Sequence, residues 1–122
     1  MNPRTAKTKG AATETLFVDY AKEWGIPHIE RRHLSGADDR GDIAGWPYVC
    51  VEVKSGARID LAGWIAELEA EIENSQASTG FVAIRPKGRP HPSKWYAALP
   101  LPILMRLMLD AGWIKDESGA AA

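Results

Sequence analysis

The chain has 122 residues, 45% of them hydrophobic and 25% charged, and its formal net charge is −1. This length and ordinary composition predict a single domain, residues 1–122, with its own core. The lone cysteine, Cys50, excludes a disulfide within the chain and favours a reducing, cytoplasmic location. We expect no secretion signal and no membrane partner, because no apolar run is long enough to span a bilayer.

Charges of opposite sign are segregated along the chain. Residues 1–10 and 81–99 carry basic but no acidic residues, whereas residues 60–73 carry only acidic charges. The charges of two basic surfaces and one acidic helix therefore nearly cancel in the net charge. A net charge close to zero is thus compatible with a basic, DNA-binding face. We interpret the acidic run itself as the solvated outer face of a helix.

The N-terminal part of the chain predicts one helix after a polar segment. We expect residues 1–9 to form a mobile basic arm, either a disordered tail or a contact to phosphates, and residues 115–122 to form a flexible tail. Residues 13–24 have a helical period, and Gly25 is a natural stop. Glu14 lies in the first turn, where a carboxylate can simply complement the helix dipole. The predicted buried stripe is Leu16, Phe17, Tyr20, Ala21 and Trp24.

A first strand is predicted over residues 26–32. It ends in a small basic cluster that includes Arg31 and Arg32. These charges are either solvated at the end of the strand or contact phosphates near a site. Residues 34–41 then form a loop that leads into Asp42.

Two apolar runs flank a turn at residues 45–47, which predicts a β-hairpin over residues 42–54. The second arm alternates, so its valines face a core while Glu52 and Lys54 share the opposite face. Folding back about the turn brings Asp42 close to Glu52. Two carboxylates at that separation repel each other unless a cation joins them, so the pattern indicates a metal site.

The next elements predict a crossover connection. Residues 61–74 have the period of a helix and residues 80–84 read as a core strand, so parallel pairing with the hairpin strand is expected. Residues 85–93 are rich in proline and form a stiff loop. The basic side chains of this loop are either solvated or in contact with a sugar-phosphate backbone, and they are Arg85, Lys87 and Arg89.

Residues 95–99 are predicted to form an edge strand, and residues 102–111 a last helix. That helix is apolar on nearly all sides, which indicates burial on two sides. Either a dimer interface or the core of the protein itself supplies the second side.

Asp42, Glu52 and Lys54 have the spacing of the PD-(D/E)xK nuclease superfamily, which the chain resembles. Gly41 stands where that motif often has proline. Two further segments resemble archaeal-type Holliday-junction resolvases: the run Tyr-Val-Cys-Val-Glu-Val-Lys that ends at Lys54, and the opening Lys-Gly-x-x-x-Glu that ends at Glu14.

The resemblance implies an α/β fold with a restriction-endonuclease-like core, in which a mixed central β-sheet is flanked by helices in αβββαβ order. It implies catalysis by Glu14, Asp42, Glu52 and Lys54 with a Mg²⁺ ion, for which Mn²⁺ can substitute. The ion is assigned to Asp42, Glu52, Glu14 and the backbone carbonyl of Val53. Lys54 then orients or deprotonates the attacking water, or offsets negative charge.

The implied function is a metal-dependent, structure-specific endodeoxyribonuclease that resolves four-way (Holliday) junctions in branched double-stranded DNA as a homodimer. The candidate DNA-binding residues are Lys9, Arg31, Arg32, Ser35, Arg85, Lys87 and Arg89. One alternative is another small nuclease of the superfamily that acts on flaps, ends or duplex DNA. Another is a DNA-binding module that keeps the fold without activity.

Overall fold

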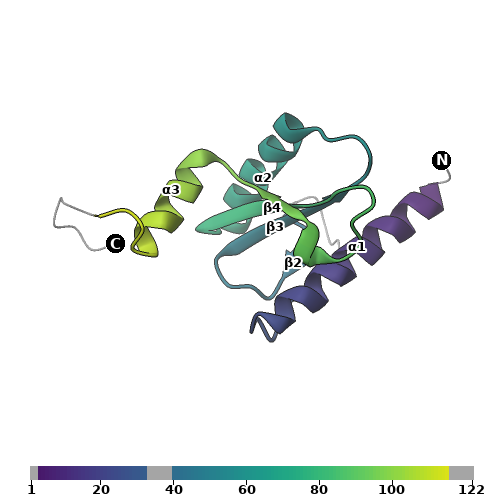
Figure 1. Ribbon diagram of the computed structural model, residues 1–122, viewed down its shortest axis with the longest axis horizontal. Coiled ribbons are helices and arrows are strands. Elements are labelled where there is room, and N and C mark those ends of the chain that lie inside the picture. The colour runs from purple at the N-terminus through teal and green to yellow at the C-terminus, as the bar shows by residue number, and fades with distance from the viewer. Residues whose placement is uncertain (1–2, 33–39, 116–122) are drawn as a thin grey trace.

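The chain has a mixed α/β fold, described for residues 3–32 and 40–115 in a computed structural model (Figure 1). The elements in chain order are α1 (Pro3–Glu23), β1 (Glu30–Arg31), β2 (Ile43–Ala44), β3 (Val49–Ser55), α2 (Leu61–Ser75), β4 (Thr79–Arg85), the 3₁₀ turn η1 (Pro92–Lys94), β5 (Tyr96–Ala98) and α3 (Leu101–Asp110). A three-stranded sheet has the order β3-β4-β5, and β1 and β2 form a separate antiparallel pair.

The two faces of β3 pack against different helices. Val51 and Val53 lie in one core with Phe17 and Val18 of α1, as the alternation along this strand predicts. On the other face, Cys50 packs with Leu68 and its neighbours from α2 and β4. The sheet therefore lies between α1 and α2 (Figure 1). Glu52 shares its face with Cys50, so its carboxylate is directed toward α2.

The predicted crossover is confirmed, because β3 and β4 are parallel and α2 connects them. Helix α2 begins after Asp60, whose carboxylate accepts a hydrogen bond of 3.1 Å from the backbone N–H of Gly63. Strand β5 adds to β4 in antiparallel orientation.

The hairpin differs in detail from the prediction. Its first arm is reduced to β2, which pairs with β1 in the register Arg31 to Ile43 and is not a strand of the β3 sheet. The predicted first strand, residues 26–32, is likewise shortened to β1. Pro27 lacks a backbone N–H and so cannot donate to a ladder, and residues 27 and 28 form a turn before β1 begins.

Helix α1 begins at Pro3 and not at the expected residue 13, so residues 3–9 belong to a helix and not to an arm. Proline is favoured in the first turn of a helix, where its missing N–H would have no partner. The predicted stripe is partly wrong at the other end, because Trp24 is 74% exposed whereas Phe17 and Ala21 are buried.

Helix α3 extends away from the sheet (Figure 1), and none of its residues is buried. Burial in the core of this same chain, one of the two expectations for this helix, is therefore wrong. Several of its large apolar side chains are exposed, namely Leu101, Met105, Leu107 and Met108. Within residues 3–32 and 40–115, no helix is both long and apolar enough to cross a membrane.

Gly45 is expected to be essential for the turn that precedes β3. Its φ is 84°, and a Cβ at this position would collide with the backbone carbonyl of His28. We expect Gly45→Ala to lower the free energy of unfolding by about 2 kcal/mol or more in urea titrations, because both strain and overlap oppose the new methyl group.

Gly10→Ala is the matched control, since Gly10 lies in α1 and a Cβ there would meet nothing within 4 Å. This second change should raise the stability by roughly 0.5–1 kcal/mol through helix propensity. Equal effects of the two substitutions would contradict the role assigned to the Gly45 turn.

Candidate metal centre

Asp42 closes the edge of β3 that does not pair with β4. Its backbone N–H donates to the Val51 carbonyl at 3.1 Å, and its Oδ2 accepts from the backbone N–H of Val53 at 2.8 Å. Gly41 makes this approach possible, because its φ is 96° and a Cβ there would lie only 3.1 Å from the Val51 carbonyl oxygen. Proline could not adopt this φ, which gives a physical reason for glycine at position 41.

Glu52 is a buried carboxylate on the α2 side of β3, and it is only 5% exposed. Its Oε1 lies 3.6 Å from Nζ of Lys54, whereas its Oε2 is buried and has no hydrogen-bond partner among the described residues. Lys54 also lies 2.8 Å from Oε2 of Glu67. One ammonium group is thus shared by two carboxylates.

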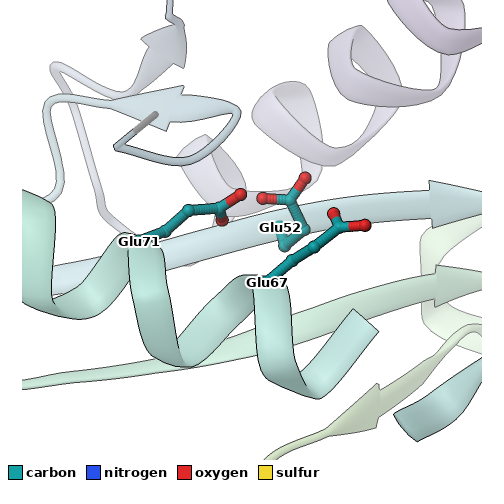
Figure 2. Close-up of side chains that lie close together, drawn as sticks. All are labelled: Glu52, Glu67 and Glu71. Atoms are coloured by element: carbon teal, nitrogen blue, oxygen red, sulfur yellow. The ribbon is translucent and has the colours of Figure 1, made fainter. Parts of the chain in front are cut away.

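Helix α2 contributes two carboxylates that sequence reasoning did not assign to the site. Oxygens of Glu52, Glu67 and Glu71 all lie within 4.8 Å of one another, and together these side chains could hold a metal ion (Figure 2). The interpretation of the acidic run as a solvated face is wrong for Glu71, which is 2% exposed. A signal was present, since Glu71 follows the buried Leu68 by three residues and so lies on the same face of the helix.

Glu14 lies on the α1 side, where Nε of Arg31 is 3.1 Å from its Oε2. Burial raises the pKa of Glu14, the hydrogen bond from Arg31 lowers it, and the charge of Asp42 raises it again. The structure therefore brings Glu14 near Asp42 but pairs it with Arg31. Glu14 does not belong to the three-carboxylate group on the α2 side.

The carboxylates of the centre crowd negative charge into a buried space. Burial and the neighbouring Glu52 raise the pKa of Asp42 to about 7, although the N–H of Val53 opposes this shift. Burial and the nearby Glu71 raise the pKa of Glu52 to about 9. Burial lowers the pKa of Lys54, but its hydrogen bond to Glu67 and the surrounding carboxylates outweigh this effect, so the net shift of the pKa is upward. A bound divalent cation would relieve the same repulsion that these protons relieve.

A basic cleft of about 680 Å³ lies where β3 and β4 end. It begins at Ser55, directly after Lys54, and its other wall includes Thr13, directly before Glu14. Nη1 of Arg85 donates to Oγ1 of Thr13 at 3.2 Å. The residues that line the cleft are Gly10, Ala12, Thr13, Ser55, Gly56, Ala57, Arg85, Pro86, Lys87, Gly88, Arg89 and Pro90.

The other predicted DNA-binding residues lie in different settings. Arg31 pairs with Glu14, and Nη2 of Arg32 donates to the carbonyl of Ile43 at 3.2 Å. Lys9 belongs to α1, one residue before the wall of the cleft. Ser35 lies outside the described residues.

Comparison of the chain with protein-family models, with curated proteins and with solved structures gives no match.

The raised pKa values predict how the stability of the metal-free protein depends on pH. Asp42 and Glu52 have native pKa values above their ordinary values of 3.8 and 4.5, so the native state holds protons that the unfolded state releases. The free energy of unfolding should therefore be highest in mild acid and fall as the pH rises toward about 9. Chemical denaturation in EDTA across this range measures the slope.

Glu52→Gln should remove much of that slope and stabilise the metal-free protein at about pH 8 by on the order of 2 kcal/mol. The neutral amide needs no proton, whereas native Glu52 at this pH must keep a proton that the unfolded chain has released. Glu69→Gln, a change on the exposed part of α2, should leave the slope as it is. The same pH dependence in all three proteins would show that the pKa of Glu52 does not differ between the native and unfolded states.

Proposed function

We propose that the chain is a metal-dependent endodeoxyribonuclease that hydrolyses phosphodiester bonds in four-way (Holliday) junctions. The observation that carries this proposal is the position of the Asp42 carboxylate. It accepts a hydrogen bond from the backbone N–H of Val53, and Val53 is the residue between Glu52 and Lys54 in the chain. A buried acid, a half-buried acid and a lysine thereby meet at one edge of a sheet. Such groups with raised pKa values are common where charge must be handled during a reaction.

The proposed fold is a restriction-endonuclease-like core. The order α1-β1-β2-β3-α2-β4 supports this assignment, because it is the αβββαβ order that the motif resemblance implies. Strand β5 and helix α3 follow this unit in the chain.

Mg²⁺ is the proposed ion, with Mn²⁺ as a substitute, because the donor groups are oxygens of carboxylates. The orphaned Oε2 of Glu52 and the crowded charges around it fit a hard divalent cation. Asp42 and Glu52 would hold the ion, with the carbonyl of Val53 and with Glu14 on the α1 side. Bound there, the ion would supply charge relief at phosphate and a more acidic water.

The side chains of the protein have separate tasks in this proposal. Asp42 is oriented by the N–H of Val53, so its position does not depend on the ion. Lys54 keeps a positive charge 3.6 Å from Glu52, where it can orient the attacking water and offset developing negative charge. Arg31 holds Glu14 in place at 3.1 Å.

The basic cleft is the proposed path of the sugar-phosphate backbone. Arg85, Lys87 and Arg89 line it, and its glycines leave room for a strand to approach. The cleft and the carboxylates are joined through neighbouring residues of the chain, Lys54 with Ser55 and Thr13 with Glu14. A backbone held in the cleft would thus lead to the proposed metal ligands.

A homodimer belongs to the proposal, because paired nicks across a four-way junction require two active sites related by a two-fold axis. Helix α3 would suit the contact, since it exposes Leu101 and Met105 and packs none of its residues into the core. An obligate interface of this kind is typically rich in apolar side chains.

Cleavage of labelled DNA tests the proposed reaction. With Mg²⁺ the protein should cut a four-way junction in preference to a flap or a linear duplex of the same sequence, and EDTA should abolish cutting. Asp42→Asn should reduce the cleavage rate at least about a hundredfold while junction affinity stays nearly unchanged, because basic residues supply most of the binding energy.

Asp19→Asn is the matched control, since Asp19 is exposed on α1. It should cleave like the parent chain. Equal cutting of the junction, the flap and the duplex would indicate a nuclease of broader range and not a junction-specific enzyme. Binding without any cutting would favour a DNA-binding module that lacks activity.

The cleft predicts separate effects on affinity. Lys87→Ala and Arg89→Ala should each weaken binding to junctions of any sequence and lower the slope of log K against log salt by about 1. Fluorescence anisotropy at several salt concentrations measures both quantities. Lys22→Ala, a substitution of an exposed residue at the end of α1, should alter neither quantity. Unchanged slopes in the two cleft variants would show that the DNA binds to another surface.

A further inference from the structure

We propose that Glu52, Glu67 and Glu71 form a second divalent-cation site between β3 and α2, separate from the ion that Asp42 would hold. This inference deepens the proposed function, because it adds a ligand set to the same centre. Two of its three ligands, Glu67 and Glu71, come from the helix that follows the Glu-x-Lys strand, where the sequence pattern had placed only a solvated acidic face.

The geometry of the three carboxylates suits a cation. Their oxygens lie within 4.8 Å of one another, a separation that one ion with ligand distances of about 2.0–2.6 Å can bridge. Glu71 points toward Glu52 from the buried face of α2 (Figure 2). Glu52 and Glu71 are 5% and 2% exposed, whereas Glu67 is exposed, so the group is closed on one side and open to solvent on the other.

An independent observation points to a ligand at this place. The Glu52 side chain is only 6% exposed, and its Oε2 is buried without a hydrogen-bond partner among the described residues. A buried carboxylate oxygen normally accepts from one or more donors, because leaving it without them is costly. A cation at the three carboxylates would supply the missing partner.

Among the described residues, the carboxylates around Glu52 outnumber the one ammonium group, that of Lys54, that pairs with them. Lys54 is 2.8 Å from Glu67 and 3.6 Å from Glu52, so its ammonium offsets one of the three negative charges. Burial of such groups close together is unfavourable unless a proton or a cation is present.

Asp42 is not a member of this group, and its Oδ2 is already held by the N–H of Val53. Glu52 nevertheless interacts with Asp42 as well as with Glu71 of the α2 group. A carboxylate has two oxygens and can serve two ions at once. This arrangement makes Glu52 the shared ligand of the two proposed sites.

Titration of the full-length, metal-free chain with Mn²⁺ tests the inference without DNA or cleavage. Isothermal titration calorimetry and the electron paramagnetic resonance signal of free Mn²⁺ should both give about two ions per wild-type chain and about one in Glu71→Gln, or a site weakened at least tenfold. Asp42→Asn should keep the α2 site. Glu73→Gln, an exposed change on the same helix, should bind like wild type.

Far-UV circular dichroism and thermal unfolding in EDTA check that Glu71→Gln is folded. Glu67→Gln provides a second variant at an exposed position, and it should also weaken the α2 site. One ion per wild-type chain, or two ions held equally tightly by Glu71→Gln, would overturn the inference. Two ions in a chain that cuts no DNA would support this site and refute the proposed nuclease, so the two failures are distinguishable.

Discussion

The hydrogen bond from the backbone N–H of Val53 to the Asp42 carboxylate is the constraint on which the candidate site depends. In the described sheet, β3 pairs with β4 on one side, so its other edge has backbone groups in need of partners. Asp42 supplies two of these partners. Its backbone N–H donates to the carbonyl of Val51, and its side-chain carboxylate accepts from the N–H of Val53. Because a carboxylate and not a second strand closes the edge, negative charge is brought directly to the strand that carries Glu52.

The same strand must stabilise the fold and carry the charges. Its valines pack on α1 and account for much of the core, whereas Glu52 faces α2 and adds repulsion with Asp42 and Glu71. A structural role would be served as well by an apolar residue of similar size, which would avoid the desolvation of a carboxylate. Retention of destabilising groups at one place is typical of sites where stability is sacrificed to function.

The elements that follow from local periodicity were predictable. Alternation along β3 and the crossover to β4 required only the two-residue period and the few topologies open to such a unit. Glu71 was missed because the buried stripe of α2 was defined by apolar residues, although its spacing from Leu68 placed it there. Trp24 fits the stripe of α1 but is exposed, because it lies directly after the last residue of the helix, beyond the part that packs on the sheet. How much of a helix is covered depends on tertiary packing and not on its local pattern. The short pairing of β1 with β2 also depends on tertiary contacts, so no local sequence pattern predicts it.

Cys50 lies beneath the loop that presents Asp42. It is 2% exposed, its Sγ is 3.6 Å from the Arg40 carbonyl oxygen, and a Cβ on Gly41 would approach that sulfur to 3.0 Å. Burial raises the pKa of this thiol to about 12, so it stays inert while the loop is docked. As the sole cysteine of the chain, it is a natural reporter of loop opening, since a thiol-specific reagent gains access only when residues 40 and 41 lift away from the sheet.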